Sequence, residues 1–299
     1  MKHNFLGFYN TSPSEKQNII NSAIITIDSS LLLDVIRIQH GELFLKILNT
    51  NQFVDRLWLP YDAAWMYHNL MHDVIKRQID KVKSSLSYLQ RFNQYVENPS
   101  SHPYIDEQTM IKLNMLTGEL RQQLQKEIKE LSLTMRRNNV KDSIATLFDE
   151  KLGTSYDESE MIQLIQEAKK LYSSETPPCV NLYRSNIERV RFHNYIAFMQ
   201  MIKKSKECNK PICFITNRIT PDWFYTNQDS IISTRHELIN SFYNQTENKF
   251  LCISAYWFVS KYGSYALQPH QKESLLKQLH KTPKPITDNT IDNNELTSL

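Results

Sequence analysis

Asp28 is the residue best placed for chemistry. It ends the run Ala23-Ile-Ile-Thr-Ile-Asp28, in which apolar and β-branched residues precede a single acid. A helix-spaced apolar pattern follows almost at once in Leu31-Leu-Leu-Asp-Val-Ile-Arg37. This order predicts a buried strand that presents one carboxylate at the C-terminal edge of a sheet, where open α/β folds bind their ligands. Asp28 is either a metal ligand or an acid that accepts backbone hydrogen bonds at the strand end, and the sequence favours the second role.

Other polar residues lack the partners that their chemistry needs. Ser29 and Ser30 follow Asp28, but no triad is evident, so both are expected to cap the next helix rather than to act as nucleophiles. His68 and His72 have the i, i+4 spacing of some metal sites, yet no glutamate follows His68 as it does in His-Glu-x-x-His. A metal site at this pair is therefore not favoured.

The composition predicts a cytoplasmic protein without a membrane segment. The 299 residues carry 35 Lys+Arg and 32 Asp+Glu, and the formal charge of +3 makes no bulk electrostatic case for nucleic acid. The four cysteines show no Cys-x-x-Cys spacing, and no signal peptide is expected, so the thiols are expected to be reduced. With only 5 glycines, the chain is not expected to form a glycine-rich loop that cradles phosphate.

Strands and helices alternate along the chain, which predicts an α/β fold with a parallel sheet and right-handed crossovers. Apolar runs predict strands at 23–28, 56–60, 211–216 and 250–254. Capping signals and helix-spaced apolar residues predict helices over 13–21, from 31, over 43–48, from 62, and over 155–171, 186–207, 233–244 and 270–280. Residues 282–299 are polar and aperiodic, and we expect them to be disordered.

Two long apolar stripes predict an inserted α-helical hairpin. The first comprises Ile75, Ile79, Val82, Leu86, Leu89 and Val96, and the second comprises Leu113, Leu116, Leu120, Leu124, Ile128, Leu131 and Met135. Together they exceed the apolar surface that two helices need to cover each other. The hairpin therefore packs on the sheet domain, or it contacts another copy of the chain or a different protein.

In this order, the segments resemble the PIN-like nuclease family, in its variant with a long helical insertion. Asp28-Ser29-Ser30 matches the family's Asp-Thr-Asn, and Trp65-Met66-Tyr67-His68 stands where the family has a Glu-Phe-His-like signature. The later motifs are matched by Pro177-Pro178, Arg191-Phe192-His193-Asn194, Thr216-Asn217-Arg218, Asp222-Trp223 and Arg235-x-Glu237. The resemblance spans roughly residues 5–262 and implies a PIN-like parallel sheet flanked by helices.

The resemblance also implies which residues surround the active centre. Family members hold Mg²⁺ or Mn²⁺ with clustered carboxylates, so that water is activated and charge on the scissile phosphate is stabilised. Of that set, this chain clearly keeps only Asp28. The other positions carry Met66, Leu182, Asn194 and Asn217 or Arg218, and the vestigial pocket is completed by Ser30, Arg191 and His193. Methionine and leucine offer no ligand to a hard cation, so no bound metal is expected.

The leading hypothesis is a catalytically degenerate nuclease that acts as a binding or regulatory subunit, by family analogy in a bacterial defence or toxin-type system. The alternative is an active metal-dependent endoribonuclease in which Asp28 and Asp222, with Asp34 or Asp62, form a rearranged set that holds Mg²⁺ or Mn²⁺. A third possibility is an assembly protein whose hairpin carries the function. The expected partner is a second copy or another protein bound through the hairpin, and nucleic acid remains open.

The same reading divides the chain into four regions. Residues 1–75 and 173–265 are expected to form the two parts of the PIN-like domain. Residues 76–172 are expected to form the helical insertion, and residues 266–299 a C-terminal helix and tail.

Overall fold

A three-stranded parallel sheet is the centre of the fold. The computed structural model describes residues 7–9, 12–98, 100–102, 105–136, 139–182, 185–227 and 230–281. The strands are β1 (Ile24–Ile27), β2 (Ile212–Thr216) and β5 (Phe250–Ser254), in the order β1-β2-β5. Almost every strand residue is buried, as expected for parallel strands that read as continuous apolar runs. The predicted α/β architecture is confirmed.

Beyond β1, the sheet continues only as isolated bridges. Ile25 pairs with Leu57, and Leu59 pairs with Leu152. The strand expected over 56–60 is thus reduced to two bridges. Pro60 has no N–H to donate to a ladder, and helix α4 (Tyr61–Val96) begins directly after it.

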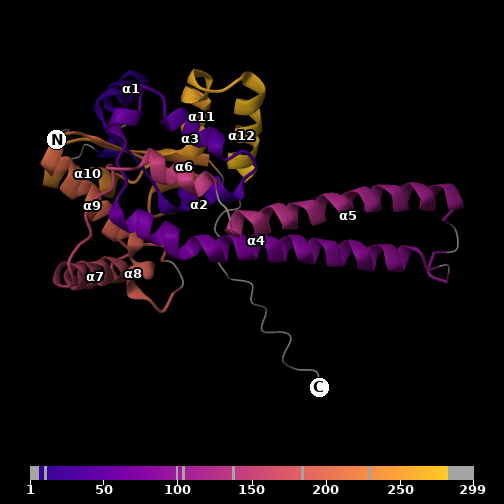
Figure 1. Ribbon diagram of the computed structural model, residues 1–299. Coiled ribbons are helices and arrows are strands. Elements are labelled where there is room, and N and C mark those ends of the chain that lie inside the picture. Colours follow the sequence, from indigo (N-terminus) through magenta and orange to yellow (C-terminus); the bar gives the residue numbers. More distant parts are fainter. Residues whose placement is uncertain are drawn as a thin grey trace. The chain divides into compact units, whose positions relative to one another are not determined.

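Helices surround the sheet (Figure 1). Helix α1 begins as the sequence predicts, because the Ser12 side chain accepts a hydrogen bond from the backbone N–H of Glu15 and a proline occupies the first turn. An aromatic cluster of Phe198, Phe214, Trp223, Phe242 and Phe250 packs the helices onto the strands. The helices of this part are α1 (Pro13–Ser22), α2 (Ser29–Arg37), α3 (Glu42–Leu48), α7 (Glu158–Ser173), α8 (Glu188–Arg191), α9 (His193–Cys208), α10 (His236–Thr246), α11 (Ala255–Tyr262) and α12 (Pro269–Lys281).

Three local expectations were wrong. The helix expected over 186–207 is broken at Phe192, whose buried ring packs in a cluster with Leu164 and Tyr195. The capping box of α7 is formed by Asp157 and Glu160, two residues later than the box of Ser155 and Glu158 that the sequence predicts. A hairpin of β3 (Phe224–Asn227) and β4 (Ser230–Thr234) precedes α10, which therefore starts at His236 rather than near 233.

The chain forms two compact units, Met1–Tyr67 with Thr146–Leu299, and His68–Ala145. The second unit contains most of α4 together with α5 (Glu107–Arg136) and the start of α6 (Asn139–Leu147), so the predicted helical hairpin is present (Figure 1). Within it, the Asn93 side-chain amide donates a hydrogen bond to the Thr117 hydroxyl over 2.9 Å. In the described part of the chain, no helix combines the length and the apolar character needed to cross a membrane. The four-region division stays a prediction, as does the tail over 282–299, which lies outside the described residues.

Candidate functional site

Asp28 lies at the C-terminal end of β1, where the sequence places it, and is 4% exposed. Its carboxylate accepts hydrogen bonds from the hydroxyls of Ser29 (3.2 Å), Ser30 and Thr216 (2.9 Å). The expected backbone donors are therefore replaced by hydroxyls. Asp28 itself is the residue before the first turn of α2, so Ser29 and Ser30 lie inside the helix and turn back to the acid instead of capping it.

Asp34 lies six residues after Asp28, in the second turn of α2, and its carboxylate has two polar partners. The Asn217 side-chain amide donates to its carboxylate over 2.7 Å, and the Arg37 guanidinium forms an ion pair with it. Burial raises the pKa of Asp34, and the nearby charge of Asp28 adds to this effect, while Arg37 and Asn217 oppose it. The charges of Asp28 and Asp34 therefore repel each other, and each carboxylate already has polar hydrogen-bond partners.

Asp222 is fully buried, and its carboxylate binds the backbone of the loop at Val180 and Asn181. Its carboxylate accepts the backbone N–H groups of Val180 (2.8 Å) and Asn181 (2.9 Å), and also the side chains of Asn194 (3.3 Å) and Thr220 (3.4 Å). Burial raises the pKa of Asp222 to about 6, although these donors and the Arg218 charge act in the opposite direction. Asp222 thus holds the loop that contains Val180 and Asn181 against its own segment.

Arg218 brings a buried positive charge into this group of acids. The residue is 7% exposed, and its backbone N–H donates to the Thr216 hydroxyl over 3.0 Å. Its charge helps to lower the pKa of Asp222. His193 is 1% exposed, and burial lowers its pKa to about 3, an effect that Asp28 opposes and Arg218 reinforces. Burial therefore favours the neutral form of the His193 imidazole.

The remaining predicted positions contribute apolar or distant side chains. Met66 is fully buried, with no exposed surface. Leu182 packs against a separate apolar cluster that contains Cys179 and Tyr195, and the Arg191 guanidinium lies 5.6 Å from the ring centre of Phe192. The structure thus gathers Asp28, Ser30, Asp34, His193, Asn194, Asn217, Arg218 and Asp222 through shared hydrogen bonds or charges, whereas Leu182 and Arg191 contact other groups.

Asp62, a member of the alternative acid set, is engaged elsewhere. It has no exposed surface, and the Arg189 Nε donates to its carboxylate over 2.8 Å. The same guanidinium lies 4.0 Å above the Trp65 ring, and burial raises the pKa of Asp62 to about 6. The sequence did not predict the role of Arg189. The available signal was Asp62 at the start of a helix, because a buried carboxylate needs a cation as its partner.

Comparison with known proteins identifies the family. A family model described as a PIN-like domain matches residues 24–238, more than half of the chain. The chain belongs to the PIN-like domain family. Comparisons with curated proteins and with solved structures gave no match. The matched range of the PIN-like domain begins with β1 and ends in α10, so it includes every residue of the site described above.

The side chains of this PIN-like domain do not fit a two-metal centre. Such a centre needs several anionic oxygens that converge on each hard cation. Among the described residues, no group of three or more His, Cys, Asp or Glu side chains is arranged to hold a metal ion. Asp28 and Asp222 are instead saturated by hydroxyl, amide and backbone donors, and Arg218 adds a positive charge close to them.

Proposed function

We propose that this PIN-like domain protein is a catalytically degenerate nuclease that acts by binding, as a regulatory or assembly subunit. The observation that carries the proposal is the buried Arg218, whose backbone N–H donates to the same Thr216 hydroxyl that is bonded to Asp28 and whose charge acts on Asp222 and His193. A guanidinium cannot be deprotonated in a protein, so it is a permanent cation among the acids. A metal ion entering the same region is repelled by that charge, and at short range in a protein interior such repulsion amounts to several kcal/mol.

The donor arrangement supports the same conclusion. A metal ion could bind Asp222 only in competition with these donors, because each of its two oxygens already accepts two hydrogen bonds. Loss of a donor from a carboxylate costs free energy that metal binding has to offset. The donors therefore favour the metal-free form of the site.

A cleavage assay tests the proposal directly. We expect no Mg²⁺- or Mn²⁺-dependent cleavage of single-stranded RNA or DNA above that of the Asp28→Asn variant. Both proteins are compared at the same concentration with and without EDTA. Metal-dependent cleavage that disappears in Asp28→Asn would instead support the active endoribonuclease with a rearranged acid set.

The helical hairpin supplies a surface for the proposed binding role. Exposed large apolar side chains gather toward its far end, between 42% and 66% exposed: Tyr88, Phe92 and Tyr95 on α4, and Leu116 and Leu120 on α5. Monomeric proteins rarely leave an apolar patch of this kind bare, because it attracts partners or promotes aggregation. We refer to these five side chains as the tip face.

Helix geometry places the tip face on one side of the hairpin. The bond between Asn93 and Thr117 marks the sides on which α4 and α5 face each other. Each step of one residue rotates a side chain by about 100°, and the two helices run in opposite directions. Phe92 and Leu116, each one residue before the bonded pair, therefore turn to the same side. Met115 is two residues before Thr117, so it turns away from that side.

Charged substitutions on the tip face are expected to reduce the assembled mass of the protein. Phe92→Glu and Leu116→Glu remove apolar contact area and add a charge that has to be desolvated in an interface. Static light scattering measures the mass, and Met115→Glu, which changes an equally exposed residue on another side of α5, is the matched control. If wild type is a strict monomer at high concentration and captures no protein from its host, the tip face does not mediate assembly and the proposed binding role of the hairpin is wrong.

A further inference from the structure

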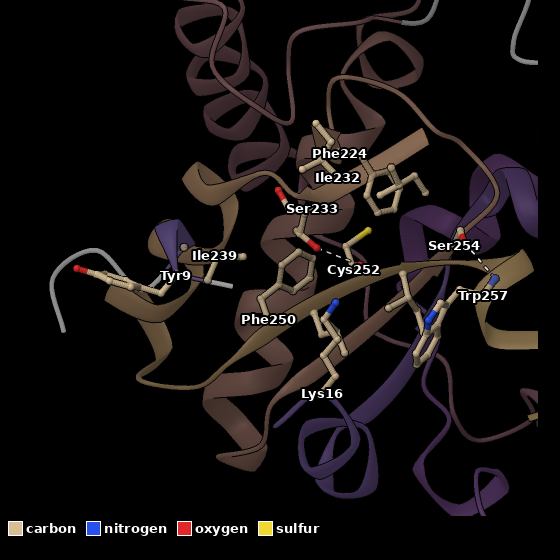
Figure 2. Close-up of a pocket in the computed structure, with 15 residues that line it drawn as sticks. Tyr9, Lys16, Phe224, Ile232, Ser233, Ile239, Phe250, Cys252, Ser254 and Trp257 are labelled. Atoms are coloured by element: carbon tan, nitrogen blue, oxygen red, sulfur yellow. Dashed lines mark hydrogen bonds between the residues drawn. The ribbon is translucent and has the colours of Figure 1, made fainter. Parts of the chain in front are cut away.

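A cavity of about 440 Å³ lies along the outer edge of β5 (Figure 2). Its volume is within the range of small-ligand and peptide-side-chain sites, about 300–1,000 Å³. All five residues of β5 line it, together with residues of the β3–β4 hairpin, Tyr9, Lys16 and Trp257. Asp28, Asp222 and the residues that donate hydrogen bonds to them are not among its lining residues.

The backbone of β5 offers unused pairing groups to this cavity. The backbone N–H of Ile212 donates to the carbonyl of Lys249 over 3.1 Å, so Lys249 faces β2. Because strand residues alternate in direction, Phe250 and Cys252 direct their N–H and C=O groups away from β2. The bond from the Thr234 hydroxyl to the Cys252 carbonyl (3.0 Å) confirms this orientation, and Figure 2 shows it beside the cavity.

Two of these outward backbone groups, the Cys252 N–H and the Phe250 C=O, can still form hydrogen bonds with an added strand. No described residue supplies a hydrogen-bond partner for the N–H of Cys252 or for the C=O of Phe250. Both residues are less than 5% exposed, so bulk water does not reach them freely. Buried backbone groups are almost always paired, and an added strand supplies one donor and one acceptor at the required spacing.

The side chains specify the rest of the ligand. Phe224, Ile231 and Ile239 provide apolar wall. Among the fifteen residues that line the cavity, Lys16 is the sole lysine or arginine, and no aspartate or glutamate is present to neutralise it. The lining thus combines an apolar subsite, a strand edge and a single ammonium group.

We propose that this cavity binds the carboxylate end of an extended peptide. The peptide adds a short strand to the outer edge of β5, where its backbone pairs with Cys252 N–H and Phe250 C=O. One apolar side chain enters the wall formed by Phe224, Ile231 and Ile239, and the terminal carboxylate lies at Lys16. The residues that line this peptide site are different from those of the tip face and from the hydrogen-bonded acids of the nuclease-like centre, so the proposal does not depend on the function proposed above.

Fluorescence anisotropy with a defined probe tests the site. The probe is a fluorescein-labelled pentapeptide of alternating valine and threonine with a free C-terminal carboxylate, and the protein is the full chain. We expect saturable binding below about 1 mM. A C-terminal amide is expected to bind about tenfold more weakly, because it loses the charge that Lys16 pairs. A peptide with N-methyl groups on its central amides is expected to bind about tenfold more weakly, because it cannot pair with β5.

Protein variants separate the two recognition elements. Lys16→Gln is expected to abolish the difference between the free acid and the amide, whereas Lys206→Gln, an exposed lysine on α9, leaves it unchanged. Three results contradict the proposal: no saturable binding of the free acid, equal binding of the N-methylated peptide, or binding of benzoate, measured by isothermal titration calorimetry, with no binding of any peptide. The last result would assign the cavity to small apolar acids.

Discussion

The Arg218→Asp variant is expected to have a stability that depends on divalent cations, unlike the wild-type protein. The substitution replaces a buried cation with a third carboxylate next to Asp222 and near His193 and Asp28. Without a cation, the added negative charge is buried among acids, which is expected to lower the free energy of unfolding by on the order of 3 kcal/mol or more. A bound Mn²⁺ ion neutralises that charge.

Urea unfolding in EDTA and in MnCl2 measures the effect. At a free Mn²⁺ concentration about 100 times the dissociation constant, linkage restores about 2.7 kcal/mol to Arg218→Asp. Wild type is expected to show no such gain. Lys206→Asp makes the same change of charge on the exposed side of α9, and it is expected to change stability by less than about 1 kcal/mol with no response to Mn²⁺. Equal stabilisation of wild type by Mn²⁺ would show that Arg218 does not exclude the metal.

Asp222→Ala is expected to be the more damaging of the alanine substitutions in the two buried acids of the site. It leaves the partly buried N–H groups of Val180 and Asn181 without their acceptor, and it also removes the acceptor of the buried Asn194 side chain. Each unsatisfied backbone group costs roughly 1–3 kcal/mol, so the expected loss is on the order of 3 kcal/mol or more. Asp222→Asn keeps one acceptor oxygen, and it is expected to lose less.

Asp28→Ala provides the comparison. The donors to Asp28 are hydroxyls, which rotate and find other acceptors, so the expected loss is about 1.5–3 kcal/mol. Denaturant midpoints measure both variants, and hydrogen exchange at Val180 and Asn181 gives a local reading. Exchange at these two amides is expected to accelerate in Asp222→Ala and to stay unchanged in Asp28→Ala. A larger loss in Asp28→Ala would mean that the loop is held by other contacts.

Periodic features of the chain were predictable, whereas the contacts that decide the site were not. The strands β1, β2 and β5 are short apolar runs, and the hairpin is a repeat of apolar residues at helical spacing. The position of Asp28 at the end of β1 followed from the same pattern. Its partner Thr216 is 188 residues away, and the partner of Asp62 is 127 residues away. Such pairs leave no periodic signal, because each depends on the complete fold.

Local capping rules failed where two candidates were close together. Asp157 rather than Ser155 caps α7, since its carboxylate and Glu160 satisfy each other's backbone N–H groups. The break at Phe192 was hidden, because the apolar spacing continues across it. A helix pattern therefore specifies which face is buried more reliably than where the helix is interrupted.

The hydrogen bond between Asn93 and Thr117 has a consequence for the alignment of the hairpin. Apolar side chains along two helices tolerate sliding, because one leucine contact resembles the next. A buried polar pair does not, since a slip of one turn, about 5.4 Å, separates the Asn93 amide from the Thr117 hydroxyl that accepts its hydrogen bond. The tip face combines residues of both helices, so it exists only in this alignment. The chain thus accepts a polar pair in an apolar seam and gains a surface whose two halves always meet in the same way.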